Sequence, residues 1–323
     1  MAGKASCATI NAVNTRHIFF MGKSRLRNTA GQTSGRLTAW LTMVLFLALT
    51  TNGCAWLHEQ ERRVIYRPTP STTTATPTLP AQAQLYFVDV PGQNAPAHIS
   101  LWWLPQPSAQ APTVLYLHGT FRNLQGNQRK IEALHNAGFA VLALDYRGWG
   151  TSTVITPSEA SIMQDTRLAW AELVRRQPLA TQRVIYGHSM GSAAAVALAS
   201  HLPAGDVGAL VLESAFTSFA DVAQEAGFLA RVLNFFNPER FDSLARISQI
   251  NAPLLMLHGK LDGTVPISLG KRLFDAAPPP KQWLSFGEAR HSDIDLIAPD
   301  VYRQTLQAFM RQHLMPPQAL SVQ

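Results

Sequence analysis

The amino-acid sequence predicts an α/β domain in which helices cover a mostly parallel sheet of eight strands. From residue 84 onward, short apolar runs alternate with longer helical stretches, which is the pattern of strand–helix–strand units. The chain has 323 residues, of which 46% are hydrophobic, so it can bury the core of one domain of about 230–250 residues. A fully disordered chain is therefore excluded.

The N-terminal 53 residues have the layout of a secretory signal of the lipoprotein type. Six of the 27 basic residues precede residue 54, where no Asp or Glu occurs, and an apolar stretch follows over 37–50. Fourteen residues span about 21 Å as a helix, less than the hydrocarbon core of about 30 Å. Residues 51–54 end in Cys54 and resemble the processing box of bacterial lipoproteins, although Thr51 stands where Leu is preferred. An uncleaved signal anchor and an organellar presequence are the alternatives.

Charge and cysteine content limit which binding partners and cross-links are expected. Outside the leader, 21 basic residues face 20 acidic ones, which removes the main reason to expect a nucleic-acid surface. Cys7 and Cys54 are the only cysteines, so with Cys54 lipidated no internal disulfide is expected. No metal motif occurs, and no cofactor is expected. We expect a periplasm-facing protein of the bacterial cell envelope, anchored to a membrane through Cys54.

A segment that precedes the domain has the composition of a spacer. Residues 68–80 are rich in Pro and Thr and poor in charge, which favours extended conformations. We assign 54–83 to an N-terminal segment with this spacer, 84–315 to the catalytic domain and 316–323 to a C-terminal tail. A plain surface loop is the alternative for the spacer.

The strands and helices of the domain are placed by their apolar patterns. The candidate strands are Leu85–Val90, Ile99–Leu104, Thr113–Leu117, Ala140–Leu144, Val184–Tyr186, Ala209–Leu212, Leu254–Leu257 and Gln282–Ser285. The candidate helices are Asn127–Ala137, Ser158–Arg176, Ser189–His201, Ile267–Ala276 and Asp300–Leu314. Segment 214–250 departs from the alternation and is either a small helical cap over the site or a crossover helix with a long loop.

A serine between two glycines is the sharpest chemical signal. Gly187-His-Ser189-Met-Gly191 joins a buried-looking strand to a helix of small residues. A turn this tight holds the serine in a strained conformation and leaves no room for a Cβ two positions before or after it. The helix start also directs free amides at a developing negative charge. Ser189 is therefore the predicted nucleophile.

A serine hydroxyl needs a base, and the base needs an orienting acid. His291 follows the last predicted strand in a polar loop, on the side of the sheet where catalytic residues collect. Asp262 lies just beyond the seventh predicted strand, and the chain order Ser, Asp, His is the one expected of this fold. Asp293 is the alternative acid, whereas Asp145 precedes the serine and is interpreted as structural.

Two amides are predicted to bind the oxyanion. One belongs to Met190, directly after the nucleophile. The other comes from the loop after the third strand, where Gly119 lets the backbone turn inward and the amide of Thr120, or alternatively Phe121, points at the site. His118 and His258 each precede a glycine at a strand end and are interpreted as structural.

Together these residues resemble the α/β-hydrolase superfamily over nearly all of 84–315. The motifs that carry the resemblance are His118-Gly119, 145–152, 187–191, 258–262 with Val265-Pro266, and His291. Within the superfamily the chain looks like the branch of small membrane-associated esterases, acylglycerol lipases and depalmitoylating thioesterases, partly through 212–218. Members of that branch often carry Asn where Thr120 stands.

The resemblance implies a serine hydrolase that cleaves an acyl ester or thioester through an acyl-enzyme. Phenylalanines of segment 214–250 suit an acyl chain or core packing equally well; they are Phe216, Phe219, Phe228, Phe235 and Phe236. A serine aminopeptidase-like enzyme is one alternative, with Glu213 or Glu288 binding the substrate amine. A catalytically silent envelope lipoprotein is another.

Overall fold

The computed structural model describes residues 56, 58–71, 77–227 and 239–314. Its centre is one eight-stranded sheet with the order β1-β2-β4-β3-β5-β6-β7-β8. β1 and β2 pair antiparallel with their neighbours, and the remaining strands run parallel. The strands are β1 Gln84–Asp89, β2 His98–Leu104, β3 Thr113–Leu117, β4 Ala140–Asp145, β5 Arg183–His188, β6 Ala209–Glu213, β7 Leu254–Gly259 and β8 Lys281–Phe286.

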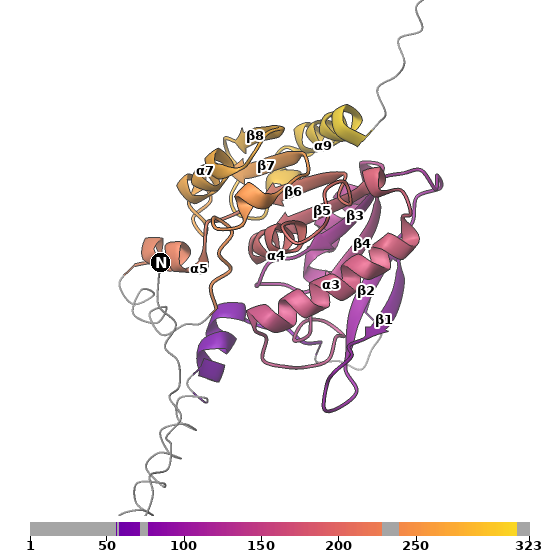
Figure 1. Cartoon of the computed structure of the whole chain (residues 1–323), viewed down its shortest axis with the longest axis vertical. Helices are drawn as coiled ribbons and strands as arrows, with labels where there is room; N and C mark the ends of the chain where they lie inside the picture. The colour runs from indigo at the N-terminus through magenta and orange to yellow at the C-terminus, as the bar shows by residue number, and fades with distance from the viewer. Residues whose placement is uncertain (1–55, 57, 72–76, 228–238, 315–323) are drawn as a thin grey trace, which may run out of the picture. The chain divides into compact units, whose positions relative to one another are not determined.

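Helices cover both faces of the sheet, as Figure 1 shows for the face that carries α3 and α4. The longer helices are α2 Gln128–Asn136, α3 Glu159–Arg176, α4 Met190–Ala199, α7 Ile267–Ala276 and α9 Pro299–Leu314. Alternate residues of a strand point to opposite faces, so Leu115 and Leu117 of β3 join one core with α3, α4 and α7. Val114 and Tyr116 join a second core with α2 and α9. The predicted fold class is confirmed.

All eight predicted strands are present, and five of the predictions end one or two residues too early. β5 continues through Gly187 to His188, because both residues still pair with β6, and β7 continues to Gly259 beside β8. Glycine and histidine are weak strand signals, so composition alone stopped these strands short. The extra residues carry the chain to the edge of the sheet at which Ser189 lies.

The described part of segment 214–250 contains the short helix α5 Phe219–Glu225 and the 3₁₀ turn Ile247–Gln249. Phe216 is buried, its ring stacks on Phe219 at 5.3 Å, and Phe219 contacts Phe241 edge-on at 5.1 Å. These rings fill the core, which favours core packing for Phe216 and Phe219. Phe228, Phe235 and Phe236 lie outside the described residues.

Part of the segment assigned to the spacer packs against the domain. Residues 58–66 are helical, and Tyr66 at the end of this helix is fully buried, with its hydroxyl donating to Glu239 Oε2 at 2.7 Å. The Ser71 amide then donates to the Gly150 carbonyl at 2.7 Å. The compact domain therefore includes residues N-terminal to 84. The leader 1–53, Cys54 and the tail 316–323 lie outside the described residues.

Candidate active site

Ser189 stands at a sharp turn between β5 and α4. Its φ of 56° is unusual for a residue with a side chain, and its amide donates to the Glu213 carbonyl at 3.0 Å. The two glycines of the motif are needed for close approach. A Cβ added at Gly187 would lie 2.3 Å from the Gly191 oxygen, and one added at Gly191 would lie 2.0 Å from the Leu117 oxygen. The sequence reasoning about these positions is therefore supported by the local geometry.

The structure brings Ser189, His291 and Asp262 into one line of hydrogen bonds. His291 Nε2 lies 2.9 Å from Ser189 Oγ, and His291 Nδ1 lies 2.8 Å from Asp262 Oδ2. All three residues are at most 9% exposed. Because the imidazole bridges a hydroxyl and a carboxylate, it can take a proton from one while the other stabilises its positive charge.

Asp262 is held as a charged group by several donors. Its Oδ1 accepts from the amides of Thr264 at 2.9 Å and Val265 at 2.8 Å, and His258 Nε2 lies 3.4 Å from Oδ2. Burial raises the pKa of Asp262, but the hydrogen bonds from His258 and His291 outweigh it and hold the pKa well below the usual carboxyl range. The carboxylate is therefore ionised at any working pH.

The alternative acid Asp293 has a different partner. Its Oδ1 accepts from the Arg290 amide at 2.6 Å, which closes the turn that carries His291. His118 and Asp145 are also structural: His118 is buried against Tyr146, and Asp145 Oδ1 accepts from the Leu124 amide at 2.9 Å. The interpretation of His118 and Asp145 as structural residues agrees with these contacts.

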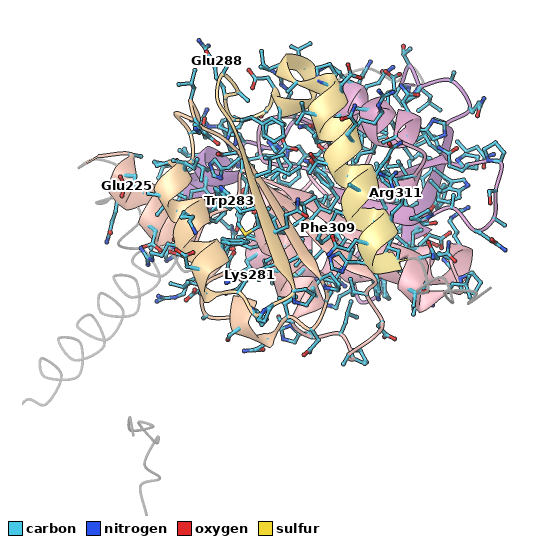
Figure 2. All side chains as sticks on the ribbon, turned by 90° about the horizontal axis from the view of Figure 1, so that it is seen from above. Glu225, Lys281, Trp283, Glu288, Phe309 and Arg311 are labelled. Atoms are coloured by element: carbon cyan, nitrogen blue, oxygen red, sulfur yellow. The ribbon has the colours of Figure 1, made fainter. Side chains whose placement is uncertain are left out.

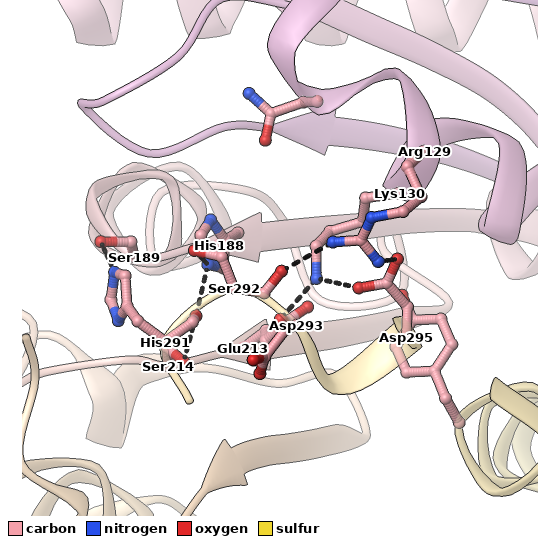
Figure 3. A network of polar contacts seen from close by, with 12 residues as sticks. Arg129, Lys130, His188, Ser189, Glu213, Ser214, His291, Ser292, Asp293 and Asp295 are labelled. Atoms are coloured by element: carbon pink, nitrogen blue, oxygen red, sulfur yellow. Dashed lines mark hydrogen bonds and ion pairs between the residues drawn. The ribbon is translucent and has the colours of Figure 1, made fainter. Parts of the chain in front are cut away.

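Two buried side chains hold the backbone of His291. His188 Nε2 lies 2.9 Å from the His291 carbonyl oxygen, and Ser214 Oγ donates to the same oxygen at 3.0 Å (Figure 3). Burial, together with the positive charge of Lys130, holds the pKa of His188 well below the usual histidine range, so the ring is neutral. Because Nε2 faces a carbonyl oxygen, which can only accept, the ring hydrogen is assigned to Nε2. Ser214 has a φ of 51°, the second strained serine at this edge. Sequence reasoning assigned neither residue a role.

A buried ionic network lies beside the histidine loop (Figure 3). Lys130 Nζ lies 2.5 Å from Glu213 Oε1 and 3.1 Å from Asp295 Oδ1. Arg129 pairs with Asp295 and donates to the Ser292 carbonyl at 3.0 Å, so the network also holds the residue that follows His291. Glu213 is fully buried and already neutralised by Lys130, which removes it from contact with a substrate.

The amides predicted to bind an oxyanion are free within the described part of the chain. There, neither the Met190 nor the Thr120 amide N–H donates to another protein group. Met190 is the first residue of α4, where helix amides have no internal acceptor. The Thr120 carbonyl accepts from Trp149 Nε1 at 3.0 Å, which fixes the peptide on one side. The Phe121 amide is equally free, so both donors in this loop remain candidates.

A cavity of about 980 Å³ opens over Ser189. The loops after β3, β7 and β8 line it, and none of its lining residues belongs to the described part of segment 214–250. Within residues 56, 58–71, 77–227 and 239–314, no three His, Cys, Asp or Glu residues are arranged to hold a metal ion. In the same residues no helix has the length and apolar character needed to cross a bilayer.

Comparisons with known proteins agree with this architecture. A family model described as serine aminopeptidase, S33, matches residues 108–241. The uncharacterized protein Rv2307c of Mycobacterium tuberculosis is 31% identical over 274 residues, which is 84% of this chain and 94% of that protein. The lysophosphatidylserine lipase ABHD12 of Danio rerio is 33% identical, with 57% of this chain and 52% of the lipase aligned.

Solved structures show the same fold at low identity. The Pyrococcus furiosus esterase Pf2001 superimposes with a TM-score of 0.61 and 18% identity, covering 76% of this chain and 98% of the esterase. The sheet order, the serine turn at the carboxyl end of β5 and a relative that is 31% identical over 84% of this chain lead to one assignment. The chain belongs to the α/β-hydrolase superfamily.

Proposed function

We propose that this protein is a serine hydrolase that cleaves carboxylic ester or thioester bonds through an acyl-enzyme intermediate. The observation that carries the proposal is the hydrogen-bonded line from Ser189 through His291 to Asp262 beneath a cavity. Nucleophile, base and orienting acid have the spacing that acyl transfer requires.

The proposed reaction has two halves. His291 Nε2 takes the Ser189 proton as Oγ attacks the acyl carbon, and the oxyanion is bound by the amides of Met190 and Thr120. The imidazolium then gives the proton to the leaving alcohol or thiol, which leaves an acyl ester on Ser189. Water, deprotonated by His291, attacks that ester and releases the acid and the free serine.

The peptidase alternative would need an acidic group for the substrate amine. Glu213 is buried and bound to Lys130, and Glu288 is an exposed loop residue that does not line the cavity; it lies at the outer end of the β8 loop in Figure 2. These contacts favour ester or thioester substrates over aminopeptidase substrates.

The first test is labelling of the purified full-length chain with a fluorophosphonate probe. We expect labelling of the wild type and none of Ser189→Ala, with p-nitrophenyl butyrate hydrolysis lost in the same variant. Ser200→Ala, at the other end of α4, is the matched control and keeps both signals. Absence of labelling in a folded wild type would favour the catalytically silent lipoprotein and overturn the proposal.

We also propose that the chain is an exported lipoprotein, lipidated at Cys54 and anchored in the bacterial envelope. Support comes from the acid-free basic leader, the apolar stretch and the position of Cys54. Metabolic labelling with a palmitate analogue tests it, because the chain offers a matched pair. We expect Cys54→Ser to abolish incorporation and Cys7→Ser to retain it, because Cys7 lies in the leader and is not the proposed lipid site. Labelling of Cys54→Ser would contradict the proposal.

A further inference from the structure

Four basic side chains line the cavity over Ser189, and they divide into two kinds. Arg129 and Lys130 are paired with Asp295 and Glu213. The other two are Arg122 and Arg290, which are exposed and form no ion pair with any residue that the structure describes.

Both unpaired arginines line the cavity and come from loops that also carry predicted catalytic groups. The loop after β3, which carries the predicted oxyanion donors, also carries Arg122, and its side chain crosses the face of Gly126: a Cβ there would lie 2.8 Å from Arg122 Cβ and 3.1 Å from its Cδ. Arg290 directly precedes His291, and its amide donates to Asp293 Oδ1. The two cations thus come from the loops that carry the predicted oxyanion donors and the base.

The acidic groups near the cavity do not cancel both cations. Among the described residues that line the cavity, Asp293 is the one that carries a carboxylate. Its Oδ1 accepts a hydrogen bond from the Arg290 amide. Asp262 is hydrogen-bonded to His291, and Asp295 forms ion pairs with Arg129 and Lys130. A guanidinium without a carboxylate partner is well suited to bind a carboxylate or a phosphate in two-pronged fashion.

Resting on the proposed function, we infer that Arg122 and Arg290 form an anion subsite and that the preferred substrates are acyl esters or thioesters carrying a carboxylate or phosphate close to the scissile bond. The charge sits on the acyl part or on the leaving group. Either position places the same anionic group at the two arginines, and esters that carry the charge on one side or the other distinguish the two positions.

The experiment compares matched pairs of esters with the full-length enzyme at low ionic strength. p-Nitrophenyl butyrate against mono-p-nitrophenyl glutarate places the charge on the acyl part. Phenyl butyrate against 4-carboxyphenyl butyrate places it on the leaving group. We expect the charged member of at least one pair to have a kcat/KM about tenfold higher, equivalent to about 1.4 kcal/mol. The ratio falls toward one in 0.5 M NaCl, since salt screens exposed charges.

Substitutions assign the effect to the two arginines. The double variant Arg122→Gln/Arg290→Gln brings the charged-to-neutral ratio to about one, and Arg122→Lys/Arg290→Lys keeps part of it, because lysine retains charge without the fork. Arg311→Gln, on α9 in Figure 2 and outside the cavity, removes a charge without changing the ratio. A ratio near one in the wild type for both pairs, or a ratio that survives the double variant, overturns the inference.

A binding measurement separates this inference from the proposed function. Ser189→Ala protein is titrated by calorimetry with monophenyl glutarate and with phenyl butyrate. Tighter binding of the anion by about tenfold, lost with both arginines replaced, supports the subsite even when the wild type hydrolyses neither ester. 4-Carboxyphenyl butyrate, titrated against phenyl butyrate in the same way, tests a charge on the leaving group. Equal binding of the charged and neutral esters in both comparisons overturns the subsite while leaving serine catalysis standing.

Discussion

Replacing Gly191 by alanine tests the close packing that positions Ser189. The added Cβ would lie 2.0 Å from the Leu117 oxygen and 2.7 Å from the His118 oxygen. Ordinary contacts begin near 3.4 Å, so the end of β3 and the serine turn must separate by about 1.4 Å. A displacement of about 1 Å costs roughly 100-fold in rate when the reacting groups lose their alignment. Overpacking of this kind also costs about 1–3 kcal/mol of folding free energy.

The assay is kcat/KM for p-nitrophenyl butyrate, with thermal unfolding measured on the same samples. Gly287→Ala is the matched control, since a Cβ at Gly287 meets nothing within 4 Å and its φ is ordinary. We expect Gly191→Ala to remain folded with about 1% of the wild-type kcat/KM and Gly287→Ala to match the wild type. A Gly191→Ala enzyme that keeps more than a third of the wild-type value would refute the close-approach argument.

Three further substitutions probe the surroundings of His291. Ser214→Ala leaves His188 as the one side-chain donor to the His291 carbonyl within the described chain, so we expect kcat to fall about tenfold with KM within about twofold; an unchanged kcat contradicts a positioning role. Lys130→Met leaves Glu213 buried without its cation and leaves Asp295 paired with Arg129 alone. We expect it to lower the free energy of unfolding in urea by about 3–5 kcal/mol, and a loss under 1 kcal/mol would count against the network. Burial raises the pKa of Asp295, but Lys130 and Arg129 outweigh burial, so the net pKa is lowered. The ionised carboxylate therefore stabilises the fold above about pH 4, and this contribution is lost as the pH falls through the folded-state pKa. We expect the wild type to lose more stability than Asp295→Asn between about pH 5 and pH 2.

The sequence was sufficient for those parts of the fold that depend on local patterns. Each of the eight predicted apolar runs forms a strand, because each run carries its own hydrophobic pattern. The serine turn could be predicted from its two glycines, although only the clash at Gly187, with the Gly191 oxygen, is local; the clash at Gly191 is with Leu117 of β3. Strand ends were less accurate, since His188 and Gly259 extend their strands through pairing with neighbours distant in the sequence.

The groups around the histidine could be predicted only in part. Asp262 and His291 follow strand ends, so topology alone brings them to one edge of the sheet, and the structure places them in hydrogen-bond contact. Their catalytic roles remain predictions until activity is measured. His258, the second side-chain partner of Asp262, was interpreted as structural. Its Nε2 lies 3.4 Å from the carboxylate, so its structural role is to hold Asp262 in place.

Ser214 illustrates why the remaining residues escape sequence reasoning. A serine after a strand ordinarily indicates a turn, and nothing local distinguishes one that reaches a backbone carbonyl 77 residues away. A strained φ of 51° costs of order 1–3 kcal/mol and persists where surrounding contacts hold it. Here the Ser214 amide donates to the Leu257 carbonyl at 3.0 Å while its hydroxyl holds His291, so one strained residue ties β7 to the histidine loop. Ser189 and Ser214 directly follow two adjacent parallel strands, and both have a positive φ. Both side chains contact His291, one at the imidazole and one at the main chain. Strain at this edge of the sheet therefore coincides with the contacts that orient the base. This arrangement is expected if a destabilising backbone conformation is retained because it preorganises proton transfer.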